Sequence, residues 1–317
     1  MSTEPAYVGY LYVHFKREDA EGEQIYFALS EGNDPLHFDD LNGGEPVLRA
    51  TLGEGGVRDP HIVRSPDGDR FYLVATDLCL YKSLDWDRHQ RWGSRSIMIW
   101  ESRDLVDWGE GRLVEVAPPE AGNTWAPESV WDPEQEAYLV HWSSKLYDGA
   151  DHQGESYNRI MYATTRDFRE FSEPRVWIDR GWHTIDTTVI EHEGAYFRFL
   201  KDERSRTHGV PKGKTVFSET SRSLTAAEWE PLAEGIGLGP ISQGEGPLVY
   251  KSNTEDKWYL WIDEFTPDRR YVPFETTDLA GGEWTPAEDF RLPTDPCHGV
   301  VLPVTAAEYE RLKTAWE

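Results

Sequence analysis

A pattern that recurs along this chain opens with the stretch Arg58-Asp59-Pro60-His61-Ile62-Val63. A turn at Pro66-Asp67-Gly68 and an aromatic strand at Phe71-Tyr72-Leu73-Val74-Ala75 follow it. A third strand ends in a small polar residue at Ile97-Met98-Ile99-Trp100-Glu101-Ser102, and a closing strand lies near Leu113-Val114. The pattern therefore predicts a unit of four short β-strands.

The same unit occurs three more times downstream. The second copy opens at Trp125-Ala126-Pro127-Glu128-Ser129-Val130, the third at Ile185-Asp186-Thr187-Thr188-Val189-Ile190, and the fourth at Gly244-Glu245-Gly246-Pro247-Leu248-Val249. An aromatic strand follows each opening, as in Trp258-Tyr259-Leu260-Trp261 of the fourth copy. Four-stranded units spaced about 50 to 70 residues apart are typical of a β-propeller.

A fifth copy is split between the two ends of the chain. The N-terminal part supplies strands at Gly9 to Phe15, at Gln24 to Ala28 and near Pro46-Val47-Leu48, and the C-terminal part supplies the missing first strand at Cys297 to Leu302. Pairing this last strand with the N-terminal ones would close the ring and remove exposed sheet edges. We therefore expect an all-β fold, a five-bladed β-propeller that forms a single domain over residues 1–317. The alternative is a β-sandwich with irregular hairpins.

One segment, Thr305 to Trp316, has the pattern of a helix. Thr305 is suited to be its N-cap, and Glu308 stands at the capping-box position. The rest of the chain predicts strands and loops.

The openings of the five copies place one residue each at an equivalent position: Asp59, Ala126, Asp186, Glu245 and His298. In a propeller the first strand of each blade lines the central axis, so these side chains should meet at one end of the channel. Three of them are carboxylic acids, and like charges held close together raise one another's pKa, which is costly unless the site has a function. We therefore predict that Asp59, Asp186 and Glu245 converge in a catalytic site.

Each of these residues also has a plainer interpretation when it is taken alone. Asp59 could be a turn residue, Asp186 could accept bonds from nearby backbone amides, Glu245 could be a loop acid, and His298 could be a buried histidine without further function. Their common register favours the catalytic interpretation. Two carboxyl groups that flank a bond are what glycoside hydrolysis requires, one protonated to donate to the leaving oxygen and one ionised to activate water.

The sequence resembles glycoside hydrolase family 43. The matching pieces come in the family's order and span nearly the whole chain: Arg58-Asp59-Pro60, Trp125-Ala126-Pro127-Glu128, Ile185-Asp186-Thr187-Thr188-Val189, Gly244-Glu245-Gly246-Pro247 and His298-Gly299. The resemblance implies a five-bladed catalytic propeller and an inverting mechanism. It also implies that Asp59 is the general base, Glu245 the general acid and Asp186 the residue that tunes and orients the acid. Arg58 and Thr187-Thr188 depart from the family's usual Pro and Pro-Ser.

The resemblance implies no required cofactor and at most one axial calcium ion. His298 matches an axial histidine that in relatives faces the channel and helps to bind such an ion through water. The chain has no cluster of Asp and Asn at calcium-loop spacing, so mostly water ligands are expected.

Further substrate-binding residues are expected at the rim of the pocket, near the ends of the second strands. Arginine can fork onto two hydroxyl groups, and a tryptophan can stack on a sugar ring. The residues predicted to bind substrate are Arg58, Asp77, Trp125, Lys145, Lys201, Arg269 and Arg270. The alternative for each is a surface-loop residue.

Composition bounds the partners and the compartment. The formal net charge of −26 makes nucleic acid and membranes poor partners, whereas a neutral oligosaccharide fits. The start, Met1-Ser2-Thr3-Glu4-Pro5, has neither the basic nor the apolar region of a signal peptide, and Cys79 and Cys297 form no C-x-x-C motif. These features predict a cytoplasmic location.

The leading functional hypothesis is an exo-acting α-L-arabinofuranosidase on plant-derived arabinan or arabinoxylan oligosaccharides. The segments Leu11 to Phe15 and Glu23 to Phe27 look like those of arabinosidase relatives. The second hypothesis is a β-xylosidase on the same scaffold, and the third is a non-catalytic sugar-binding propeller, which would not need three acids. An endo-acting arabinanase is disfavoured by the absence of a signal peptide.

Overall fold

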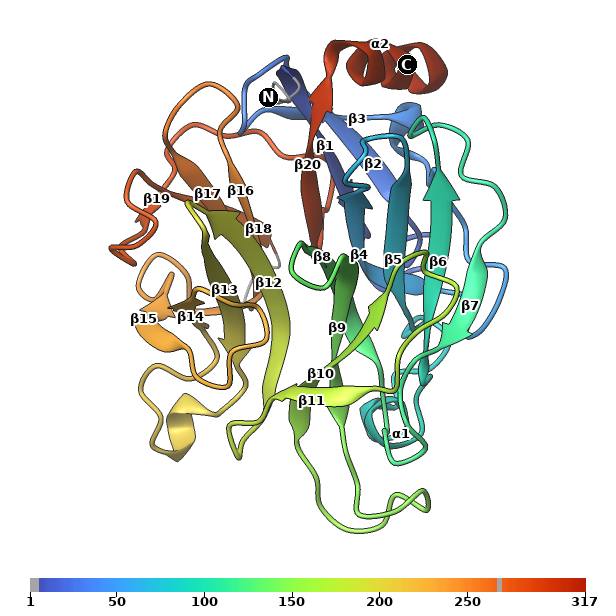
Figure 1. The fold of residues 1–317 in the computed structure, drawn as a ribbon, viewed down its shortest axis with the longest axis vertical. Coiled ribbons are helices and arrows are strands. Elements are labelled where there is room, and N and C mark those ends of the chain that lie inside the picture. Colours follow the sequence, from blue (N-terminus) through green and yellow to red (C-terminus); the bar gives the residue numbers. More distant parts are fainter. Residues whose placement is uncertain (1–5, 267–269) are drawn as a thin grey trace.

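The structure, a computed structural model, describes residues 6–266 and 270–317. Over these residues the strands form five four-stranded antiparallel sheets arranged around a central axis, with β20, β4 and β12 in the middle and β7, β15 and β19 at the outside (Figure 1). The predicted five-bladed β-propeller is confirmed.

Four blades are continuous in sequence: β4 (Val57–Arg64), β5 (Phe71–Asp77), β6 (Ser96–Ser102) and β7 (Arg112–Glu115); β8 (Trp125–Asp132), β9 (Ala137–Lys145), β10 (Asn158–Thr165) and β11 (Arg175–Ile178); β12 (Thr184–His192), β13 (Ala195–Asp202), β14 (Val216–Ser221) and β15 (Glu230–Ile236); β16 (Gln243–Lys251), β17 (Trp258–Thr266), β18 (Arg270–Thr276) and β19 (Thr285–Pro286).

The fifth blade joins the two ends of the chain, as predicted. Its strand order is β20-β1-β2-β3, with β1 (Tyr7–His14), β2 (Tyr26–Ser30), β3 (Phe38–Asp40) and β20 (Gly299–Thr305). β20 is antiparallel to β1, with Val300 opposite Val13, and it also contacts β16 and β4. This pairing closes the ring.

One strand of that blade was wrongly predicted. The outer strand is β3 at Phe38–Asp40 and not the segment 46–48, from which Leu48 forms an isolated bridge with Ile25. The loop of residues 31–37 turns the chain back, so residues 38–40 pair with β2 before residues 46–48 can.

Two α-helices lie among the described residues. Helix α2 (Ala306–Trp316) begins as predicted, with the Thr305 hydroxyl accepting from the Glu308 amide and the Glu308 carboxylate accepting from the Thr305 amide. The sequence reasoning missed α1 (Trp86–Arg91), a helix of six residues between β5 and β6, which begins at the N-cap Asp85. Neither helix is long and apolar enough to cross a membrane.

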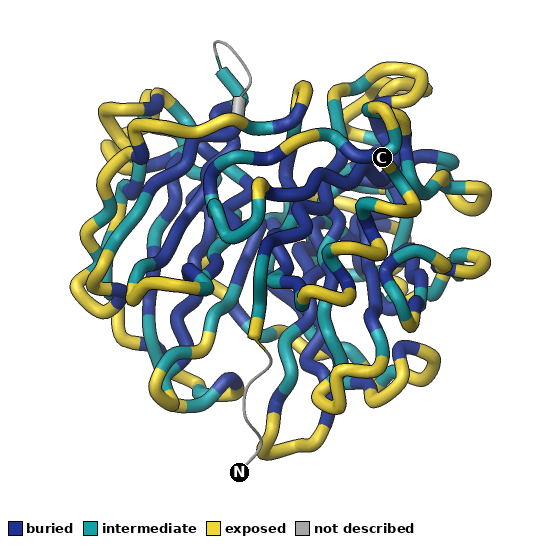
Figure 2. Tube along the Cα trace, turned by 90° about the horizontal axis from the view of Figure 1, so that it is seen from above, coloured by how far each residue is buried: buried dark blue, intermediate teal, exposed yellow. Residues whose placement is uncertain are grey.

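The core lies between the blades, where the aromatic second strands pack face to face. Between the first two blades, Tyr72, Tyr138 and Phe168 form a buried aromatic group with ring centroids 4.3–5.7 Å apart. Such rings bury large apolar areas and resist displacement. Figure 2 shows buried segments inside the ring and exposed residues in the loops around it. The blades therefore hold the inner strands in fixed positions around the axis.

Candidate active site

A β-bulge on the inner strand of four blades positions the candidate catalytic residues. Asp59, Ala126, Asp186 and Gly246 each take a left-handed conformation, with φ between 46° and 51°. At each bulge the register shifts, so that two residues of the inner strand face one residue of the second strand. Outside glycine this conformation carries strain, and bulges of this kind commonly aim side chains at functional sites.

The bulges correct the predicted alignment by one residue. Gly246, and not Glu245, is equivalent to Asp59, Ala126 and Asp186. A Cβ atom at Gly246 would lie 2.7 Å from Cγ of His298, so only glycine fits there. Glu245 instead shares the preceding position with Arg58, Trp125 and Ile185, and the cavity lining includes all four.

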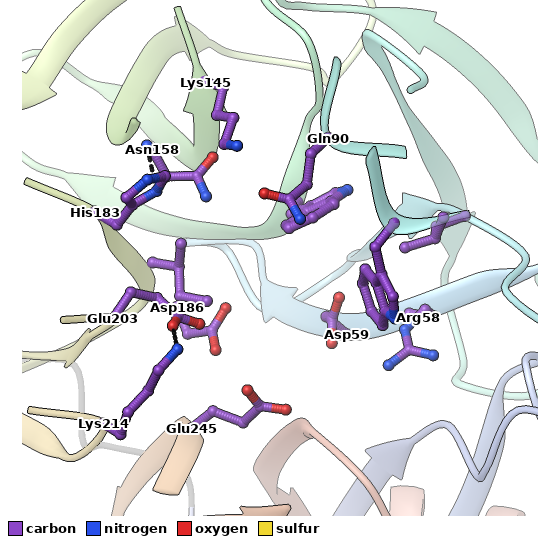
Figure 3. A pocket seen from close by; sticks show the side chains of 14 residues that line it. Arg58, Asp59, Gln90, Lys145, Asn158, His183, Asp186, Glu203, Lys214 and Glu245 are labelled. Atoms are coloured by element: carbon purple, nitrogen blue, oxygen red, sulfur yellow. Dashed lines mark hydrogen bonds and ion pairs between the residues drawn. The ribbon is translucent and has the colours of Figure 1, made fainter. Parts of the chain in front are cut away.

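The three predicted acids line one cavity of about 450 Å³ at one end of the central axis (Figure 3). Four blades contribute to it, through their inner strands and the loops that follow their second strands. The lining residues are Arg58, Asp59, Leu78, Trp86, Gln90, Trp125, Lys145, Asn158, His183, Ile185, Asp186, Glu203, Lys214 and Glu245.

Asp59 is held in its ionised form. Its Oδ2 accepts from the Thr76 hydroxyl at 2.9 Å, and its Oδ1 lies 3.3 Å from Nδ1 of His298. Burial alone would raise the pKa of Asp59, but His298, Arg58 and Thr76 together hold that pKa below its usual value. An ionised carboxylate in this cavity can accept a proton from water.

Asp186 is the acid with the raised pKa. Its side chain is almost fully buried, and Oδ2 accepts from the backbone N–H of Gly246 at 3.0 Å. Burial, together with the negative charge of Glu245, raises the pKa of Asp186 to about 6 against the opposing effect of His298. Through its bond to Gly246, Asp186 also fixes the backbone next to Glu245.

Glu245 is paired with a buried lysine. Nζ of Lys201 lies 2.5 Å from Oε2 of Glu245 and 2.6 Å from Oε1 of Glu203, and Lys214 pairs with the other oxygen of Glu203. The side chain of Lys201 is 2% exposed, whereas that of Glu245 is 27% exposed and faces the cavity. Lys201 thus favours the ionised form of Glu245 when the cavity is empty.

The family comparison agrees with this geometry. A family described as a probable glycosyl hydrolase domain, related to glycoside hydrolase family 43, matches residues 5–310. The chain belongs to this family. In this member of the family, three carboxyl groups meet in one cavity.

Relatives of this glycosyl hydrolase domain have related names. An α-L-arabinofuranosidase of Bifidobacterium longum subsp. longum is 37% identical over 272 residues, which cover 78% of this chain and 25% of the relative. The chain thus spans about a quarter of the length of that curated relative.

Solved structures share the fold. A thermostable family-43 glycoside hydrolase has a TM-score of 0.52 at 19% identity, with 75% of this chain and 74% of that chain covered. The catalytic domain of the family-62 α-L-arabinofuranosidase of Coprinopsis cinerea has a TM-score of 0.51 at 13% identity, with 92% and 77% covered.

His298 links Asp59 in the cavity to a second buried pair, Glu128 and His61. Its Nδ1 faces Asp59 and its Nε2 lies 4.0 Å from Oε1 of Glu128, whose other oxygen lies 3.3 Å from Nδ1 of His61. Burial lowers the pKa of His298, but Asp59, Asp186 and Glu128 raise it to about 9. The ring is therefore cationic at neutral pH.

A cationic His298 does not suit a metal ion beside it. Both of its ring nitrogens face carboxylates, and the described residues include no group of three or more His, Cys, Asp and Glu that could hold a metal. An ion held near His298 through water stays a prediction.

The predicted substrate-binding residues have different surroundings. Trp125 and Lys145 line the cavity, and so does Arg58, although its guanidinium pairs with Glu18 and Glu23. Lys201 is not among the lining residues, but its Nζ pairs with Glu245, which is. Asp77 lies outside the lining, where its carboxylate accepts from the Glu54 amide at 2.7 Å and holds a loop. Arg269 and the side chain of Arg270 lie outside the described residues.

Sequence reasoning missed part of the lining. Trp86 and Gln90 come from α1 and Asn158 from the start of β10, while His183, Glu203 and Lys214 flank β12, β13 and β14. Asn158 and Lys214 lie where a long loop leads into a third strand, whereas the predicted rim residues lie near the ends of second strands. Polar residues at the start of a third strand are therefore the signal that would have found both.

Proposed function

We propose that this domain is an exo-acting, inverting α-L-arabinofuranosidase that removes terminal arabinofuranose from arabinan or arabinoxylan oligosaccharides. The observation that carries the proposal is the single cavity that Asp59, Asp186 and Glu245 line together. The name of the Bifidobacterium relative supports the sugar, although that protein is much longer than this chain.

In this proposal Asp59 is the general base. Its ionised carboxylate, oriented by Thr76 and His298, takes a proton from a water molecule that attacks the anomeric carbon. Thr76 also links this blade to the next one, because its hydroxyl oxygen accepts from the Ala126 backbone amide at 2.7 Å.

Glu245 is the general acid, since it faces the cavity and is the more exposed of the two remaining acids. It must be protonated to assist departure of the leaving oxygen. Because Lys201 favours the ionised carboxylate, we propose that the bound sugar weakens this ion pair and leaves Lys201 with Glu203. Asp186 then acts through its charge and through the Gly246 backbone.

Trp86 and Lys145 belong to one wall of the cavity. The β5–β6 and β9–β10 connections are tied together near this wall, because the Arg91 guanidinium donates to the His152 carbonyl at 2.7 Å and Trp92 stacks on His152 at 4.4 Å. These contacts support a binding site whose wall keeps a fixed shape toward the substrate.

The test compares 4-nitrophenyl α-L-arabinofuranoside with 4-nitrophenyl β-D-xyloside on the purified chain. We expect a kcat/KM at least about tenfold higher for the arabinofuranoside, which corresponds to about 1.4 kcal/mol. A preference for the xyloside would replace the proposal with a β-xylosidase. Turnover of neither, with binding of arabinose retained, would support a sugar-binding propeller.

A further inference from the structure

Lys145 differs from every other lysine of this acidic chain. Each of the other eight forms a hydrogen bond or an ion pair with an oxygen atom. Lys145 has no such partner among the residues that the structure describes, although the chain has 58 acidic residues. Its side chain instead lines the cavity at the end of β9 (Figure 3).

The surroundings of Lys145 make this unpaired charge costly. Burial, and after it the charge of Arg91, lower the pKa of the Lys145 ammonium group. Asp87 and Glu155 act in the opposite direction, but neither forms an ion pair with it. Partial burial of a cation without a counter-ion is unfavourable, so an anion that entered the cavity would recover part of the lost free energy.

Three polar side chains surround the same space. Asn158 is 3% exposed, and its side-chain oxygen, an acceptor, has no hydrogen-bond partner among the described residues, so it can accept from a sugar hydroxyl or a water, whereas its side-chain NH2 group is a donor. The backbone N–H of Asn158 donates to Nδ1 of His183 at 3.1 Å, so Nε2 of that neutral ring carries the hydrogen. Burial lowers the pKa of His183 to about 4, which keeps the ring neutral. Gln90 completes the group.

The cavity therefore has two ends that differ in how their charges are paired. Figure 3 shows Lys145, Asn158 and Gln90 on the side away from Glu245. The cavity volume of about 450 Å³ lies in the range of pockets that enclose a ligand larger than a single small ring. A sugar that carries an anion would place it near Lys145, because the cations at the other end, among them Lys201, Lys214 and His298, already have carboxylate partners.

We propose that Lys145, Asn158, His183 and Gln90, here called the Lys145 end, bind the carboxylate of a uronic acid in the departing part of the substrate. The proposal rests on the proposed function and adds a substrate class to it, acidic arabinofuranosyl oligosaccharides. A planar monoanion matches one ammonium group flanked by neutral N–H donors, whereas a dianionic phosphate would need more positive charge.

The test uses three arabinofuranosides that differ only at C6 of the departing hexose: D-glucuronate, D-glucose and D-glucose 6-phosphate. For the unaltered chain we expect kcat/KM to be at least about tenfold higher for the glucuronate than for the glucose compound, mainly through KM. Lys145→Met should abolish that ratio and Lys145→Arg should retain part of it. Lys257→Met, which removes an ion pair with Glu275 on another blade, is the control and should leave the ratio unchanged.

Equal kcat/KM for the glucuronate and glucose compounds would overturn the inference, and so would an equal loss on both in Lys145→Met. Preference for the phosphate would overturn the carboxylate assignment. If arabinose is released from none of the three, the proposed function fails. The inference is then decided by ligand-observed NMR with free D-glucuronate and D-glucose. Binding of glucuronate that Lys145→Met abolishes would support it, and absence of binding would overturn it.

Discussion

The ammonium nitrogen of Lys201 lies 2.5 Å from Oε2 of Glu245, the carboxyl group proposed to be the general acid. A buried cation at this distance stabilises the ionised form of the acid, opposite to what proton donation requires. Glu203 offers Lys201 a second anion at 2.6 Å, so the lysine can remain paired when the ion pair with Glu245 weakens. We therefore propose that Lys201 is a positioning residue that sets the pH range of the reaction.

Lys201→Met should shift the basic limb of the pH profile of kcat/KM to higher pH. Without the cation the Glu245 carboxyl group holds its proton longer as pH rises, and the basic limb reports the essential acid. The measurement is kcat/KM between pH 4 and 10 with an arabinofuranosyl disaccharide. Lys212→Met, which removes a surface ion pair with Glu234, is the matched control. An unchanged basic limb in Lys201→Met would show that the lysine is merely structural.

Replacing Asp59 and replacing Glu245 should lower kcat in different ways. Asp59→Ala should lower kcat by about 10²–10⁴-fold on every substrate, because it removes the group that activates water. Glu245→Ala should cause a similar loss on a disaccharide but a smaller one on 4-nitrophenyl arabinofuranoside, since nitrophenol departs without protonation. Steady-state kinetics on both substrates measure this. Equal impairment of Glu245→Ala on the two leaving groups would contradict its role as the acid.

His298→Gln should destabilise the fold in a pH-dependent way. The pKa of His298 is raised from 6.5 to about 9, so its contribution to stability is fully present below about pH 6.5 and is lost as pH rises through about 9. At pH values below about 9 the variant leaves Asp59 and Glu128 without their shared cation. Urea denaturation at pH 6, 8 and 10 should show a loss of unfolding free energy that is largest at pH 6 and smallest at pH 10. A constant difference would show that His298 contributes through packing alone.

The repeat in the sequence predicted the fold because each blade repeats an opening strand and an aromatic second strand. The same repeat could not place Glu245. Alignment by residue type put the acid in register with Asp59 and Asp186, whereas the bulge aligns Gly246 with them. The signal lay in Gly246, which is glycine because the His298 ring occupies the space of a side chain.

The electrostatics of the site could not be predicted from the sequence. The sequence marked Lys201 as a rim residue, but its pairing with Glu245 depends on how far β13 carries it toward β16. The lining residues of α1 depend on a six-residue helix with too few residues to show a periodic pattern.

The central claim, that Asp59 and Glu245 act across one cavity by direct displacement with water, is tested most directly by following the anomer of the released sugar. ¹H NMR of the first product formed from an aryl α-L-arabinofuranoside distinguishes the two anomers before mutarotation mixes them. We expect β-L-arabinofuranose first, because carboxyl groups about 6.5–9.5 Å apart leave room for the attacking water. Initial release of the α-anomer would mean retention through a covalent intermediate, with carboxyl groups about 5–5.5 Å apart, and would contradict direct displacement by water.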